Sequence, residues 1–258
     1  MKLWFQSCGN LGTDPAWNDY EQCLDRHLRK VARPDTEIDL HGVKVWSHGV
    51  VTYRYHAYLN TAQIINNAIK AEREGYDAFA QTGTLDLGFH EIREAVSIPV
   101  VFPIETALHI GALLAPKIGF LVMNPAFLGY LNEKAKSYGF QDRITPGGCA
   151  NITPSELQRA FKNPKTVINE LEAVAKKIGE QGANVLICAG NPITMLLVEQ
   201  GVTELGGVRV LDALGVLVKA TELMVDLNKM GIDRNKMGVY SPLPKEEVTN
   251  VRETFGAA

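Results

Sequence analysis

The chain has 258 residues, 46% of them hydrophobic, and a formal net charge of −3 at pH 7. This length allows a sizeable core, in one large α/β unit or in two small lobes. The sequence contains no run of lysine and arginine and no stretch of about 18 apolar residues, so neither nucleic acid nor a membrane is an expected partner.

Short apolar runs alternate along the chain with longer amphipathic stretches. The predicted strands are Lys2–Ser7, Glu37–Leu40, Ala78–Gln81, Pro99–Phe102, Ile118–Met123, Val185–Cys188 and Val208–Leu211. The predicted helices are Asp14–Ala32, Ala62–Glu74, Phe89–Ala95, Glu105–Leu114, one ending near Tyr138, Pro154–Phe161, Lys165–Gln181, Ile193–Gln200 and Gly215–Met230. The alternation predicts an α/β fold with parallel sheets covered by helices on both faces.

The two ends of the chain and its cysteines indicate where the protein resides. The first residues are typical of a strand and not of a signal peptide, and the polar tail 241–258 is expected to be a loosely held terminus. The four cysteines have no CxxC spacing, so neither a zinc site nor a disulfide framework is indicated. We expect a cytoplasmic protein with no metal and no cofactor.

An internal repeat divides the chain. The stretch from Gly75 to Thr84 matches the stretch from Gly182 to Asn191: each has a glycine that ends a helix, an apolar strand and a glycine turn. A second pair, Ile98–Phe102 and Val208–Asp212, follows. The repeat predicts two lobes related by a pseudo-twofold axis, with both glycine turns facing one cleft. Residues 1–104 plus 212–258 would form the first lobe and residues 105–211 the second. The alternative is that the match reflects only the common βαβ pattern.

The residues around the second strand of each half resemble a known family. From Asp86 onward the sequence has Asp-x-Gly, a helix, Pro-Val-Val and then Glu105, and the second half has Cys188-Ala189-Gly190 and a strand ending at Asp212. These motifs resemble the Asp/Glu/hydantoin racemase superfamily, which includes maleate isomerases and arylmalonate decarboxylases. The resemblance covers about residues 2–230 and implies a cofactor-independent enzyme.

The cysteine pattern departs from that of the superfamily, whose racemases use one cysteine in each lobe. The first position falls on Gly83, so a two-cysteine racemase of the usual form is excluded. Gly83-Thr84 resembles the arylmalonate decarboxylases instead. The second position falls on Cys188 if two residues are deleted from the preceding strand, and on Gly190 without that gap. Cys188 is therefore either the catalytic acid or a strand-end residue beside the site.

The two glycine turns are candidate anion sites. An enediolate formed beside a carboxylate or amide needs preorganised donors, which backbone N–H groups at a helix start provide. Gly83, Thr84, Gly190 and Asn191 are the candidates, and the alternative is that they form ordinary strand-to-helix turns. A thiol near a helix N-terminus is a suitable proton donor, whereas most free cysteines are small buried hydrophobes.

The first strand ends at another candidate wall of the cleft, which contains Cys8 and Asn10. Cys8 carries the acid role if Cys188 does not, or else it only packs. Glu105 and Asp212 either bind a substrate amide or cap their helices. Asn124 stands near the position of a tyrosine donor in arylmalonate decarboxylases.

The segment Tyr53–Tyr58, which includes Tyr55 and His56, predicts a lid over a planar or anionic ligand, or else an interface patch. Ser47-His48 could add a base. Isolated histidines such as His90 and His109 are more often surface or core residues.

The leading functional hypothesis is chemistry at the carbon beside a carboxylate or amide. A single proton donor favours decarboxylation followed by protonation, or isomerisation. The first alternative is hydrolysis of an amide or lactam with the turns as oxyanion hole. The second is a non-catalytic small-acid binding protein. We expect a small carboxylate or amide as substrate, and a homo-oligomer.

Overall fold

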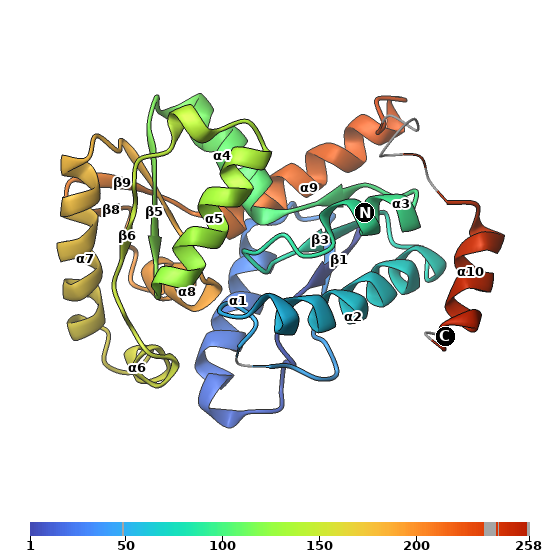
Figure 1. Ribbon diagram of the computed structural model, residues 1–258, viewed down its shortest axis with the longest axis horizontal. Coiled ribbons are helices and arrows are strands. Elements are labelled where there is room, and N and C mark those ends of the chain that lie inside the picture. The colour runs from blue at the N-terminus through green and yellow to red at the C-terminus, as the bar shows by residue number, and fades with distance from the viewer. Residues whose placement is uncertain (48, 235–240, 242, 257–258) are drawn as a thin grey trace.

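The chain folds into two lobes, each built on a β-sheet flanked by helices (Figure 1). This computed structural model describes residues 1–47, 49–234, 241 and 243–256. Every strand pairs in parallel with its neighbours except one at an edge. The predicted α/β class with two parallel-sheet lobes is confirmed.

The first sheet has the strand order β2-β1-β3-β4. Its strands are β1 (Lys2–Gln6), β2 (Glu37–His41), β3 (Ala78–Gln81) and β4 (Val100–Val101). The helices of this part of the chain are η1 (Pro15–Trp17), α1 (Asn18–Val31), α2 (Arg54–Arg73) and α3 (Phe89–Ala95).

The second sheet has the strand order β6-β5-β7-β9-β8, in which β8 is antiparallel. Its strands are β5 (Ile118–Val122), β6 (Gly148–Cys149), β7 (Val185–Cys188), β8 (Glu204–Leu205) and β9 (Val208–Leu211). Its helices are α4 (Pro103–Leu114), α5 (Pro125–Ser137), η2 (Gln141–Arg143), α6 (Pro154–Ala160), α7 (Lys165–Glu180) and α8 (Asn191–Glu199). The orders of the first four strands correspond, so β1 matches β5 and β3 matches β7.

The repeated sequence motif occupies matching places in the two sheets. β3 and β7 are buried along their whole length, as strands covered by helices on both faces must be. The glycines before them, Gly75 and Gly182, have φ of +78° and +95°. These left-handed conformations end α2 and α7 and turn the chain back into the sheet. The same local sequence therefore delivers Gly83 and Gly190 to the carboxyl ends of equivalent strands.

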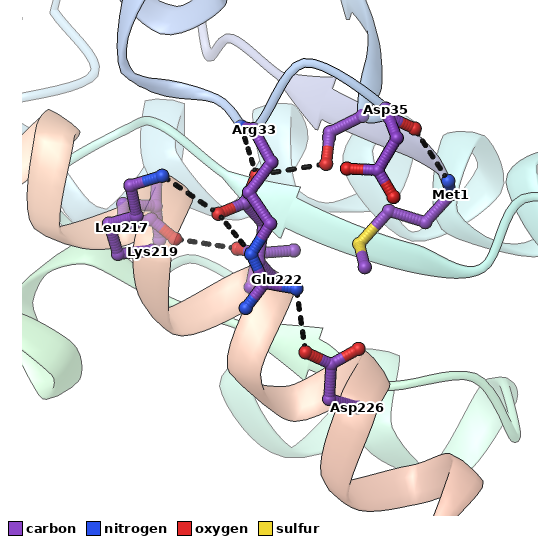
Figure 2. Close-up of polar contacts among 9 residues, drawn as sticks. Met1, Arg33, Asp35, Leu217, Lys219, Glu222 and Asp226 are labelled. Carbon is purple, nitrogen blue, oxygen red and sulfur yellow. Dashed lines mark hydrogen bonds and ion pairs between the residues drawn. The ribbon is translucent and has the colours of Figure 1, made fainter.

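Helix α9 (Ala213–Lys229) follows the second sheet and returns to the first. Its Glu222 is fully buried and accepts hydrogen bonds from the backbone N–H of Arg33 at 2.7 Å and the hydroxyl of Thr36 at 2.9 Å. Figure 2 shows this cluster, in which Lys219 also reaches Glu222 and the Arg33 guanidinium reaches Asp226. These bonds hold α9 against the loop before β2.

Two segments differ from the sequence-based expectation. Helix α2 begins at Arg54, well before the predicted start at Ala62, because no proline or glycine interrupts 53–74. The described part of the tail, which was expected to be a loosely held terminus, forms helix α10 (Lys245–Thr254), in which Val248 is buried. Figure 1 shows α10 beside α2 at the edge of the first lobe. None of the described helices has the length and apolar character needed to span a membrane.

Candidate functional site

A cavity of about 250 Å³ opens where the carboxyl ends of β1, β3 and β7 meet. Ligands of open parallel sheets bind beyond these strand ends. Six of the predicted site residues line this cavity, namely Cys8, Asn10, Gly83, Thr84, Gly190 and Asn191. The structure therefore brings the two glycine turns and the end of the first strand together.

One hydrogen bond joins the two glycine turns. The backbone N–H of Gly190 donates to Oγ1 of Thr84 at 3.2 Å, and both residues are buried. Since Oγ1 accepts this bond, the hydroxyl of Thr84, a residue that lines the cavity, still has a proton to donate. The backbone N–H groups of Thr84 and Asn191 reach no acceptor among the described residues. Three donors are thus available to an oxyanion.

Only the second turn opens a helix. Gly190 is the N-cap of α8, so the positive end of the helix dipole lies at Asn191. Gly83 is different, because α3 begins only at Phe89. The prediction that both turns open helices is therefore wrong for the first one, which is held by other means.

Hydrogen bonds from the side chains of Gln81 and Asp86 hold the first turn. The amide of Gln81 donates to the carbonyl of Leu87 at 2.9 Å and accepts from its N–H at 2.8 Å. Asp86, whose φ is +47°, accepts from the N–H groups of Ile104 and Glu105 at the start of α4. Burial raises the pKa of the Asp86 carboxyl to about 6, although these two bonds oppose the shift.

The thiol of Cys8 occupies the space above Gly83. A Cβ at position 83 would lie 3.2 Å from the Cβ of Cys8 and well inside van der Waals contact with its Sγ. Cys8 therefore fills, from the end of β1, the place of a side chain on residue 83. Burial raises the pKa of the Cys8 thiol to about 12, and the charge of Asp86 adds to the shift. The thiol is accordingly protonated near neutral pH.

Among the described residues, no titratable group lies within 4 Å of a Cβ built on Gly190. A Cβ there would lie 3.3 Å from the terminal methyl of Met123, which follows β5 and lines the cavity. The two faces of the cavity are therefore unlike: a thiol covers one glycine and a thioether covers the other.

Cys188 is not among the residues that line the cavity. Its side chain is 0% exposed and packs with Leu121, Leu186 and Ile193 in the core of the second lobe. Burial raises the pKa of this thiol to about 12 as well. This placement favours the register without a gap, in which Gly190 faces the cavity and Cys188 stands behind it.

The structure does not bring the other candidate residues to the cavity. Glu105 pairs with Arg93 at 2.6 Å, and Asn124 caps α5 by accepting from the N–H of Phe127. Asp212 caps α9 by accepting from the N–H of Gly215, and it also contacts His27. These three side chains therefore cap helices or pair with neighbouring side chains, away from the cavity.

The predicted lid belongs to helix α2. Tyr55 is 69% exposed, and His56 bonds to the hydroxyl of Ser47. Neither residue lines the cavity. The preceding loop forms the wall instead, through Trp46, Val50 and Val51. His48 lies outside the described residues.

The sequence interpretation missed the wall formed by η1 and α1. Trp17, Tyr20 and Glu21 line the cavity, and Trp17 packs against core clusters of both lobes. The Asp14-Pro15 pair signalled the helix start but not which helix face would meet the second lobe. Among the described residues, no group of three potential metal ligands exists.

The chain is similar to known proteins over most of its length. The family model described as Asp/Glu/Hydantoin racemase matches residues 17–221. A hydantoin racemase from Pseudomonas sp. (strain NS671) is 28% identical over 236 residues, which cover 90% of each chain.

Two of the solved structures that share the fold are allantoin racemases. The allantoin racemase from Klebsiella pneumoniae has a TM-score of 0.79 at 17% identity, and the match covers 95% of this chain and 94% of that one. The allantoin racemase from Pseudomonas fluorescens has a TM-score of 0.78 at 18% identity, with coverage of 94% and 97%.

Proposed function

Because the chain belongs to the Asp/Glu/hydantoin racemase family, we propose that it catalyses cofactor-independent proton transfer at the carbon beside a carbonyl of a small cyclic amide. The observation that carries this proposal is the cavity in which the Cys8 thiol and the two glycine turns meet. The names of its relatives, hydantoin and allantoin racemases, suggest a ring of this kind.

In the proposed reaction, the thiolate form of Cys8 takes the proton from the carbon, and the bonding electrons move onto the carbonyl oxygen. The N–H groups of Thr84 and Asn191 and the hydroxyl of Thr84 stabilise the resulting enolate oxygen. Protonation of the carbon by the Cys8 thiol then completes the cycle.

The transfer takes place on one face of the ring. Met123 covers the opposite side, and its thioether can neither donate a proton nor accept one from the carbon. The enzyme should therefore exchange the proton of one enantiomer with retention, in contrast to a racemase with two cysteines.

Hydrogen–deuterium exchange in heavy water tests this proposal. Each enantiomer of a singly substituted hydantoin is incubated with the protein, and proton loss at the ring carbon is followed by NMR above the uncatalysed rate. We expect exchange in one enantiomer only, and a drop of about 100-fold or more in Cys8→Ala. Cys188→Ala is the matched control and should stay active. Unchanged exchange in Cys8→Ala, or its loss in Cys188→Ala, would contradict the assignment.

The high pKa of Cys8 favours a second reaction of the same site. A thiol that stays protonated is suited to protonate an enolate formed by loss of CO₂, which needs no base. CO₂ release from a carboxylated cyclic amide or an arylmalonate, with no exchange in the hydantoin, would select this reaction. Proton exchange from the hydantoin should instead accelerate by about tenfold per pH unit above pH 7, because the thiolate is the reactive form.

A further inference from the structure

The phenol of Tyr20 lines the cavity from helix α1 and is 9% exposed. Helix α1 packs against α8 of the second lobe, which begins at Asn191 (Figure 1). The Tyr20 ring meets the Trp17 ring edge-on, with centroids 5.8 Å apart, and lies 6.1 Å from the ring of Phe161, which follows α6. These aromatic contacts hold the ring where the two lobes meet.

A hydrogen bond joins the Tyr20 hydroxyl to the second lobe. Burial raises the pKa of Tyr20, and a side-chain bond with Asn191 opposes that shift. A bond that favours the phenolate must donate to it, so the amide of Asn191 donates and Oη of Tyr20 accepts. The hydroxyl therefore keeps its proton near neutral pH, and none of the described residues accepts that proton in a hydrogen bond.

The same hydroxyl lies near the thiol of Cys8. Negative charge on Cys8 adds to the rise in the pKa of Tyr20, yet the two side chains form no hydrogen bond with each other. A carbonyl oxygen bound at the backbone N–H of Asn191 would lie two bonds from the carbon that Cys8 deprotonates. A donor that is close to both Cys8 and Asn191 is therefore well placed for that oxygen.

The cavity also needs neutral donors. None of its described lining residues is a lysine, arginine or histidine, so hydrogen bonds have to stabilise the charge of an enolate. From these observations we infer that Tyr20 is a further catalytic residue, whose hydroxyl donates to the enolate oxygen. The side chain of Asn191 is its positioning residue, because it occupies the acceptor site of Oη and leaves the proton for the ligand. The enolate in this inference rests on the proposed function.

Tyr20→Phe removes the hydroxyl and leaves the ring. In the NMR exchange assay, kcat should fall about 100-fold while KM changes little, because the bond strengthens only as the enolate forms. Tyr76→Phe is the matched control and should keep its exchange rate. Its hydroxyl donates to Asp39 at 2.7 Å, and Tyr76 does not line the cavity.

Binding of tetramic acid tests the contact without turnover, because this five-membered lactam is a stable enolate near neutral pH. Titration calorimetry should show binding to Tyr20→Phe that is about tenfold or more weaker than to the unchanged protein, since the lost bond is to a charged oxygen. A hydantoin with two methyl groups on the reacting carbon forms no enolate there. It should bind both proteins alike, which also reports that the cavity is intact.

Asn191→Ala tests the positioning role, because it removes the amide and keeps the backbone N–H. It should slow exchange in the unchanged background and have little further effect on Tyr20→Phe. Additive losses would overturn this role of Asn191.

The affinity for tetramic acid decides the role of Tyr20 itself. Equal affinities of Tyr20→Phe and the unchanged protein would overturn the inference, and so would a failure of both to bind. Weaker binding by Tyr20→Phe, in a protein that exchanges no hydantoin proton, would instead support the contact and contradict the proposed function.

Discussion

A double-mutant cycle between Cys8 and Gly83 would test the geometry that makes this site one-sided. Gly83→Ala places a methyl group in the space of the Cys8 Sγ, and the backbone at position 83 has no positive φ that would itself strain an alanine. Overlap of this kind costs about 1–3 kcal/mol of unfolding free energy. Once Cys8→Ala removes the sulfur, the nearest atom is a Cβ at 3.2 Å, which a shift of a few tenths of an ångström relieves.

The expected result is strong coupling between the two positions. Gly83→Ala should destabilise the protein by about 1–3 kcal/mol, whereas the double variant should be no less stable than Cys8→Ala alone. Urea unfolding of the four proteins measures these differences. Additive effects would refute the placement of the thiol. The double variant Cys8→Ala with Gly83→Cys extends the cycle to activity, because it returns a thiol to the same face and should recover part of the proton exchange.

Two buried carboxylates give further predictions. The raised pKa of Asp86, about 6 in the folded state, means that the folded protein retains a proton that the unfolded chain loses at lower pH. Stability contributed by this group should therefore fall as the pH rises from about 4 to about 6, and Asp86→Asn should reduce that slope in urea titrations across the range. Glu222→Ala should cost about 1–3 kcal/mol in the same assay, because it leaves the N–H of Arg33 and the hydroxyl of Thr36 without their acceptor. Glu222→Gln, which retains an acceptor oxygen, should cost less.

The parts of the fold that the sequence predicted are those encoded locally. β3 and β7 are continuous apolar runs, and the glycines before them end helices, so the strands and the turns at Gly83 and Gly190 could be placed from pattern alone. The start of α2 could not be placed in this way, because the aromatic and charged residues at 54–61 are compatible with both loop and helix.

The site itself depended on contacts between distant segments. Parallel pairing of Gln6 with Gln81 sets the end of β1 beside the end of β3, and this register puts Cys8 over Gly83. Glu21 lies on a strongly amphipathic helix, where an acid is expected to face solvent, yet it lines the cavity. Cys188 was expected near the cavity but lies in the core. It stands two residues before Gly190, which does line the cavity, and that difference in register decides where the thiol lies.

The pseudo-symmetry of the lobes suggests how a second face could be supplied. Cys8 follows β1 and covers Gly83, and in the same way Met123 follows β5 and covers Gly190. Each lobe thus places a sulfur-containing side chain over the glycine of the neighbouring strand, but only one of them can carry a proton. Met123→Cys should therefore add a thiol on the opposite face, and its proton transfer should be slow because the shorter side chain stands further from the ring.

The expected consequence is a change in stereochemistry rather than in overall rate. In heavy water the second enantiomer should begin to exchange, and chiral chromatography should show slow racemisation where the unchanged enzyme shows none. Met123→Ser is the matched control, since it shortens the side chain equally but supplies a hydroxyl that is a far weaker acid than a thiol. Exchange of both enantiomers by the unchanged enzyme would refute the one-sided mechanism. Equal racemisation by the serine and cysteine variants would show that loss of Met123 opens the second face to water, and that no protein group is needed there.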